Sequence, residues 1–418
     1  MQRYFLLLIS LLGAPPSSAA EPVGPPGANL PGLWQYLDEH SAELNAARLE
    51  SNAAAERSEA TGVLPDPSLR IEWQDINQPG GVTLNPSRVG ATKYTFLQPV
   101  PGWGKREAQQ QIASASARQM EAQQHAVQAE LHSRMRLAFA QYYRAWQALQ
   151  LNQEISGFAA SATRLAQQRY EHGLVKQQDW LKAQLDEAAL QSERYSLQAE
   201  LQRTQARINA MLNRPAGAVL AEPQQLPELP PPARLEETAL QQRLGDGSPQ
   251  LTAQREQSAA AQANLDLTRT NQRPDFIVAI SPIQRGDSIS SWDAMLEFTI
   301  PLQQNSHSAH RHEAARQLEA SQAREQALAQ NLAADVSEHG AALRAASEQL
   351  QLIRSRTLPL AELNYQSALA GYQQGSMDYA TLWQARRELQ RNRVDELDAL
   401  LAQQLHLAEL ERLIGDTP

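Results

Sequence analysis

The chain contains two copies of one pattern, separated by 202 residues. Each copy has a pair of short alternating apolar segments, a long helical run, a Tyr-x-x-Gly break and a second helical run. Repeat units of solenoid proteins are roughly 20–50 residues long, so this spacing indicates a duplicated half-molecule instead. The matched positions are Phe96, Pro99, Tyr170, Gly173, Ala183 and Leu212, which recur as Phe298, Pro301, Tyr372, Gly375, Ala385 and Ile414.

The first 20 residues have the pattern of a cleaved secretory signal peptide. Arg3 is followed by the apolar run 5–12 and by small residues at 18–20. This run is shorter than the ~20 apolar residues of a membrane-spanning helix. The chain has no cysteine, which excludes a disulfide, a thiolate metal site and a lipidated cysteine at the cleavage site. The net charge of −9 disfavours a nucleic-acid partner.

The pattern predicts a mainly α fold with a small β part. Because both long helical runs extend over about 65 residues, each is expected to be about 100 Å long. The return helix covers only about half of that length, and the helix before each β-hairpin fills the rest. The expected segments are a first repeat at 21–222 (helix about 33–60, β-hairpin about 68–99, helical hairpin about 104–213), a Pro-rich linker at 223–235 in the equatorial region, and a second repeat at 236–418 (helix ending near 271, β-hairpin about 274–300, helical hairpin about 303–414).

The β-hairpins predict shared membrane strands. Leu69, Ile71 and Trp73 alternate with polar residues, as on a strand with one apolar face. Strands of about 8–10 residues can cross a bilayer when tilted. Four strands cannot close a barrel, and an open edge in lipid leaves backbone groups unpaired. Subunits would therefore share one barrel, as a dimer or a trimer. The alternative is a soluble hairpin pair that caps a coiled coil.

With these features the chain resembles the TolC-type outer-membrane efflux channels. The resemblance rests on the double repeat, the two Tyr-x-x-Gly breaks and the passage from Phe96-Leu97-Gln98-Pro99 to Gly104-Lys105-Arg106. It implies a homotrimer with a twelve-stranded barrel in the outer membrane and a twelve-helix tunnel in the periplasm. The implied partners are a periplasmic adaptor and an inner-membrane RND pump. The channel would be a passive conduit, neither an enzyme nor the holder of a cofactor.

The passage 98–106 is most similar to the metal-exporting branch of these channels, which implies heavy-metal cations as the substrate. Drug efflux and type I secretion remain open within the same class. A periplasmic coiled-coil adaptor or a structural coiled-coil protein is the alternative from a different class, although an adaptor would have one helical hairpin and not two.

The two breaks are expected to form the periplasmic tips, which the resemblance identifies as a gate and an adaptor-docking surface. The alternatives are a helix turn with glycine at its C-cap and aspartates that cap helices. The valine common before the family's tip glycines is absent here, and Thr381 and Gln384 replace a pair of aspartates in the lumen. The candidate residues are Tyr170, His172, Gly173, Leu174 and Asp179 in the first tip and Tyr372, Gln374, Gly375, Ser376 and Asp378 in the second.

Three histidines form a weak candidate metal site at the start of the second long helix. His307, His310 and His312 have the pattern H-x-x-H-x-H, and imidazole suits Zn, Cu or Ni. No cysteine or carboxylate completes a convincing site. A solvated helix start is therefore the favoured interpretation of these three histidines.

Overall fold

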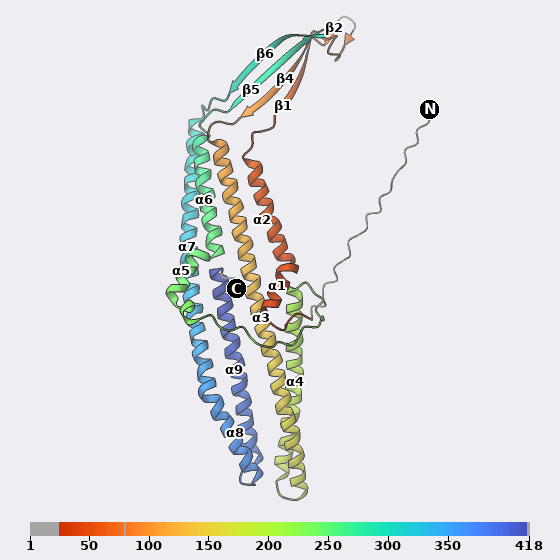
Figure 1. The fold of residues 1–418 in the computed structure, drawn as a ribbon, viewed down its shortest axis with the longest axis vertical. Helices are drawn as coiled ribbons and strands as arrows, with labels where there is room; N and C mark the ends of the chain where they lie inside the picture. Colours follow the sequence, from red (N-terminus) through yellow and green to blue (C-terminus); the bar gives the residue numbers. More distant parts are fainter. Residues whose placement is uncertain (1–24, 79–80, 416–418) are drawn as a thin grey trace, which may run out of the picture.

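The protein is elongated, with a small sheet at one end and two helical hairpin tips at the other (Figure 1). The computed structural model describes residues 25–78 and 81–415. The expected signal peptide at 1–20 lies outside this range. None of the helices in the described ranges is both long and apolar enough to cross a membrane.

The elements repeat in the same order in the two halves, as the duplication predicts. In the first half they are α1 (Leu30–His40), α2 (Ala42–Thr61), β1 (Ser68–Gln74), β2 (Asn77–Gln78), β3 (Gly81–Val82), β4 (Ala91–Val100), α3 (Lys105–Glu171) and α4 (Gln177–Met211). In the second half they are a 3₁₀ turn (Pro232–Leu235), α5 (Glu237–Gly247), α6 (Pro249–Thr270), β5 (Phe276–Arg285), β6 (Ser288–Phe298), α7 (Gln304–Leu352), a π turn (Ile353–Thr357), α8 (Leu358–Gln373) and α9 (Tyr379–Ile414).

Both hairpins lie in one four-stranded antiparallel sheet with the order β1-β4-β5-β6. Among the described residues, β1 and β6 each pair along one edge only. The strand register places apolar side chains beside one another in a row across the sheet, because Leu69 pairs with Phe96 and Phe96 pairs with Ile280. All three of these side chains are exposed. The first hairpin loop also contains a small β2–β3 ladder.

The helices of each half form two stacks that lie side by side, which we call columns, as the helix lengths predict. The 67-residue α3 is unbroken, and it packs against α2 in its upper part and α4 in its lower part (Figure 1). One prediction was wrong in detail: the helix expected at 33–60 is two helices. Ser41 has extended backbone angles and caps α2, and its Oγ accepts a hydrogen bond from the Leu44 N–H at 3.3 Å. Ser248 makes the equivalent break between α5 and α6.

The second long helix is also interrupted, contrary to the prediction of one helical run of about 65 residues at the start of the hairpin at 303–414. Pro359 has no N–H, so a regular α-helix would leave the carbonyl of Ser355 without its bond. The chain forms a π turn there, in which the Leu358 N–H donates to the carbonyl of Ile353, five residues earlier. This turn separates α7 from α8, whereas α3 continues through the corresponding level of the first half.

The helices meet in separate apolar cores at several levels along the described part of the molecule. We call the level where α1, α5 and the C-terminal ends of α4 and α9 lie the waist (Figure 1). Here Arg136 of α3 is 4 % exposed, and its guanidinium lies 2.9 Å from the Glu411 carboxylate of α9. Burial raises the pKa of Glu411, and Arg136 opposes that shift. This ion pair joins the two repeats.

Candidate functional site at the hairpin tips

The first tip is a tight helix end built around Gly173. Its φ of +68° lies in the left-handed region, where glycine carries no side-chain penalty. The Gly173 N–H donates to the carbonyl of Tyr170 at 2.9 Å, and the Leu174 N–H donates to that of Arg169 at 2.8 Å. These are the two bonds of a Schellman motif. His172 is the C-cap residue of α3, and Leu174 is 72 % exposed.

The second tip repeats this motif around Gly375, whose φ is +75°. The Gly375 N–H donates to the carbonyl of Tyr372 at 3.1 Å, and the Ser376 N–H donates to that of Gly371 at 2.9 Å. Gln374 occupies the C-cap of α8. A Cβ placed on Gly173 or on Gly375 would meet no atom of the described residues within 4 Å. Glycine is therefore required at these two positions by the left-handed backbone conformation and not by a close contact.

The two candidate aspartates lie at the starts of the return helices. Asp378 is the N-cap of α9, and its carboxylate accepts a hydrogen bond from the Thr381 N–H at 2.9 Å. Hydrogen bonds from Thr381 lower the pKa of Asp378. Asp179 lies in the first turn of α4, where a negative charge interacts favourably with the helix dipole. The geometry thus gives both residues the helix-capping or dipole role that the sequence had left as an alternative.

Arg169 connects the two tips, and sequence reasoning missed it. Its guanidinium carbon lies 4.6 Å from the ring centroid of Tyr372, and one of its nitrogens lies 3.5 Å from the Tyr372 carbonyl oxygen. Arg169 is in α3 and Tyr372 is in α8, so the contact joins the first repeat to the second. The Tyr372 side chain is 4 % exposed, which makes the contact largely dry on its aromatic side.

Aromatic stacking holds each tip together. Tyr170 stacks on Trp180 with ring centroids 5.5 Å apart, and Tyr379 stacks on Trp383 at 6.1 Å. Tyr372, Tyr379 and Trp383 also belong to an apolar cluster that includes residues of α3, α4, α8 and α9. Of the tyrosines predicted for the site, Tyr372 is thus a core residue and Tyr170 lies at the surface.

A half-buried carboxyl group makes a second connection between the hairpins. Burial raises the pKa of Asp186 on α4, while Lys182 and then the side chain of Trp383 on α9 oppose the shift. One carboxylate oxygen of Asp186 is buried without a hydrogen-bond partner among the described residues. Burial, followed by the charge of Asp186, raises the pKa of Tyr379 well above its ordinary value.

A groove of about 750 Å³ lies just above the tips, between α4 and α9. Its charged lining includes Lys182, Arg387 and Arg391, with Glu193 and Glu388. Gln384, one of the positions where a tip aspartate was expected from the resemblance, also lines it. The groove therefore has more positive than negative side chains.

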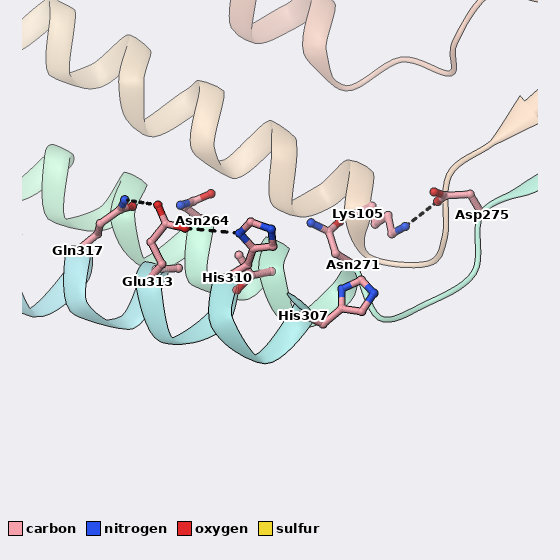
Figure 2. A pocket seen from close by; sticks show the side chains of 10 residues that line it. Lys105, Asn264, Asn271, Asp275, His307, His310, Glu313 and Gln317 are labelled. Atoms are coloured by element: carbon pink, nitrogen blue, oxygen red, sulfur yellow. Dashed lines mark hydrogen bonds and ion pairs between the residues drawn. The ribbon is translucent and has the colours of Figure 1, made fainter. Parts of the chain in front are cut away.

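The histidine cluster lies far from the tips, below the sheet. His307 and His310 line a pocket of about 620 Å³ together with the Lys105–Asp275 ion pair, whereas His312 does not line it. Figure 2 shows the His310 ring turned toward the Glu313 carboxylate, at 3.4 Å, and the His307 ring apart from both. No set of three or more His, Cys, Asp or Glu side chains in residues 25–78 and 81–415 could surround a metal ion.

Comparison with known proteins identifies the architecture. The sequence pattern of the family described as "Outer membrane efflux protein" matches residues 33–214 and, a second time, residues 240–416. The chain belongs to the outer membrane efflux protein family. Each matched stretch lies within one of the two repeats, and the predicted fold class, mainly α with a small β part, is confirmed. This efflux protein is a TolC-type outer-membrane channel and not an enzyme, which also removes the adaptor alternative.

Individual relatives are distant. The efflux protein is 24 % identical over 389 residues to the cobalt-zinc-cadmium resistance protein CzcC of Cupriavidus metallidurans, covering 89 % of this chain and 86 % of that one. A crystal structure of CusC superposes with a TM-score of 0.78 at 18 % identity, over 97 % of this chain and 100 % of that one. The crystal structure of VceC from Vibrio cholerae superposes with a TM-score of 0.75 at 16 % identity, over 92 % of this chain and 96 % of that one.

Proposed function

We propose that three copies of this efflux protein close one barrel of twelve strands. The observation that carries the proposal is the pair of sheet edges on β1 and β6, which have no neighbour among the described residues. In hydrocarbon each unpaired backbone group costs several kcal/mol, so the edge of one copy needs the opposite edge of another. The row of exposed apolar side chains that includes Leu69, Phe96 and Ile280 would then face lipid.

The helical part supports the same assembly. Leu185 on α4 is 71 % exposed and Leu363 on α8 is 64 % exposed, and these helices lie on opposite sides of the lower half (Figure 1). In a ring of three copies, α4 of one copy would pack against α8 of the next. The result is a tunnel of twelve helices in the periplasm below an outer-membrane barrel. The proposed segments remain a cleaved signal at 1–20, repeats at 21–222 and 236–418, and a linker at 223–235.

The tips would act as the gate and as the surface that binds a periplasmic adaptor of an RND-type pump. Arg169 and Tyr372 hold the two hairpins of one copy together, which supports a closed arrangement. An adaptor could bind the exposed parts of both turns, where Leu174 projects into solvent. The proposed residues of the gate and of this surface are Tyr170, His172, Gly173, Leu174, Asp179, Tyr372, Gln374, Gly375, Ser376 and Asp378. Among them Tyr372 is buried, so its proposed role is in the gate, through the contact with Arg169.

The substrate that we propose is a heavy-metal cation. Support comes from the similarity to CzcC, a protein named for resistance to cobalt, zinc and cadmium. A second candidate is the export of drugs or other organic molecules. The groove lined by Lys182, Arg387 and Arg391 favours it, because these side chains would not concentrate cations.

A deletion strain separates the two substrates. We expect it to lose tolerance to Co, Zn and Cd and to regain it when the wild-type protein is supplied. Unchanged metal tolerance with increased sensitivity to drugs and detergents would overturn the metal assignment. Fractionation of the complemented strain tests the channel itself, because a protein found as a soluble monomer would contradict the shared barrel.

A further inference from the structure

Two histidine side chains face each other across the interface between α7 and α9. The Nδ1 atoms of His339 and His406 are 3.2 Å apart, and the ring centroids are 5.5 Å apart with an angle of 40° between the planes. Both residues are half-buried. In the part of the chain that the structure describes, neither ring makes another hydrogen bond. The pair lies near the waist, since His406 precedes the end of α9 by eight residues.

We propose that His339 and His406 bind one divalent transition-metal ion, with Zn²⁺ as the reference ion. Zinc–nitrogen bonds are about 2.0–2.1 Å long, and a tetrahedral angle places two such nitrogens about 3.3 Å apart. The observed 3.2 Å therefore fits an ion that both Nδ1 atoms coordinate after small rotations of the rings. Imidazole nitrogen is a preferred ligand of Zn, Cu and Ni.

The surroundings act on the His406 ring in two opposite directions. Burial, followed by the neighbouring His339, lowers the pKa of His406. The carboxylates of Glu338 and Glu409 act on His406 in the opposite direction, which means that negative charge lies within electrostatic range of the ring. The two imidazoles are the only ligands proposed, so water molecules would complete the coordination shell.

The site belongs to the second repeat alone. The positions 202 residues earlier are Leu137 and Thr204, which supply no imidazole. The expected stoichiometry is therefore one ion per chain. An ion held here would connect α7 to α9 at the waist, where α5 also packs on α7. The site does not depend on which substrate passes through the tunnel, because it lies between two packed helices.

The test is isothermal titration of the purified full-length protein in detergent, without a polyhistidine tag, using Zn²⁺ alone. We expect one site per chain in the wild type, and at least a tenfold loss of affinity in His339→Gln and in His406→Gln. His125→Gln, which changes an exposed histidine on α3, is the matched control and should bind like the wild type. A triple His307→Gln, His310→Gln, His312→Gln variant should also keep the site.

A second readout identifies the ligands directly. Cu²⁺ bound to the wild type should give an electron paramagnetic resonance spectrum with nitrogen coupling from two imidazoles, and His406→Gln should remove that signal. The unfolding temperature without metal checks that each variant remains folded. The proposal is overturned by the absence of binding at millimolar Zn²⁺, or by binding that neither single variant weakens.

Discussion

Removing the Arg169 side chain should open the tunnel. Arg169 contacts Tyr372 through a guanidinium 4.6 Å above the ring centroid, and a half-buried contact of this kind contributes about 1 kcal/mol. The hydrogen bond to the Tyr372 carbonyl, at 3.5 Å, lies at the limit of useful geometry and adds nothing to this figure. If three copies open together, Arg169→Ala shifts the equilibrium by about 3 kcal/mol, or roughly 100-fold.

The assay is single-channel recording in planar lipid bilayers with purified protein. We expect the ratio of open to closed time to increase about 100-fold in Arg169→Ala. Arg164→Ala is the control, because Arg164 lies on the same helix and its hydrogen bonds within residues 25–78 and 81–415 go to Ala160 and Ser161 of that helix. An Arg169→Ala channel that is correctly assembled, yet opens no more than three times as often as the Arg164→Ala channel, would refute a gating role for Arg169.

Three further predictions concern stability and assembly. Gly173→Val together with Gly375→Val should abolish export but leave the protein in the outer membrane, since each change costs about 1–2 kcal/mol of left-handed backbone strain at a tip; normal export in a resistance assay would contradict the docking role. Arg136→Met should destabilise the waist by about 3–5 kcal/mol, and adding Glu411→Leu should restore most of that loss, as thermal unfolding can measure. Asp378→Ala should cost about 1 kcal/mol through loss of the helix cap, whereas Asp378→Asn should cost less. The pKa of Asp378 is lower in the folded state than in the unfolded state, so its ionised carboxylate stabilises the fold fully above pH ~4. This stabilisation is lost as the pH falls through the folded-state pKa, and the unfolding temperatures of the wild type and Asp378→Ala should become equal in acid.

The features that local sequence determines were predictable. Gly173 and Gly375 end their helices because a left-handed residue is needed there, and a Tyr-x-x-Gly break within helical sequence signals that need. The strands followed from the alternation of apolar and polar residues. The two columns followed from helix lengths alone, because a long amphipathic helix must be covered along its whole apolar stripe.

The features that depend on contacts between the repeats were not predictable. Arg169 and Tyr372 are 203 residues apart, and nothing in the neighbourhood of either residue indicates the other. The same holds for Arg136 and Glu411, and for the facing pair His339 and His406.

Two local signals were present and could have been used. Pro359 lies inside the second long helical run, where a missing N–H requires an irregular turn. Ser41 comes directly before α2, and serine is a preferred N-cap residue. Reading these two residues would have corrected the predicted helix boundaries without a structure.

The most direct test of the shared barrel is an electron cryo-microscopy reconstruction of the purified protein in lipid nanodiscs. We expect three copies around one axis, a closed barrel of twelve strands in the lipid, and β6 of each copy paired with β1 of the next. A single copy with an open four-stranded sheet, or an assembly in which the edges of β1 and β6 remain unpaired, would contradict it.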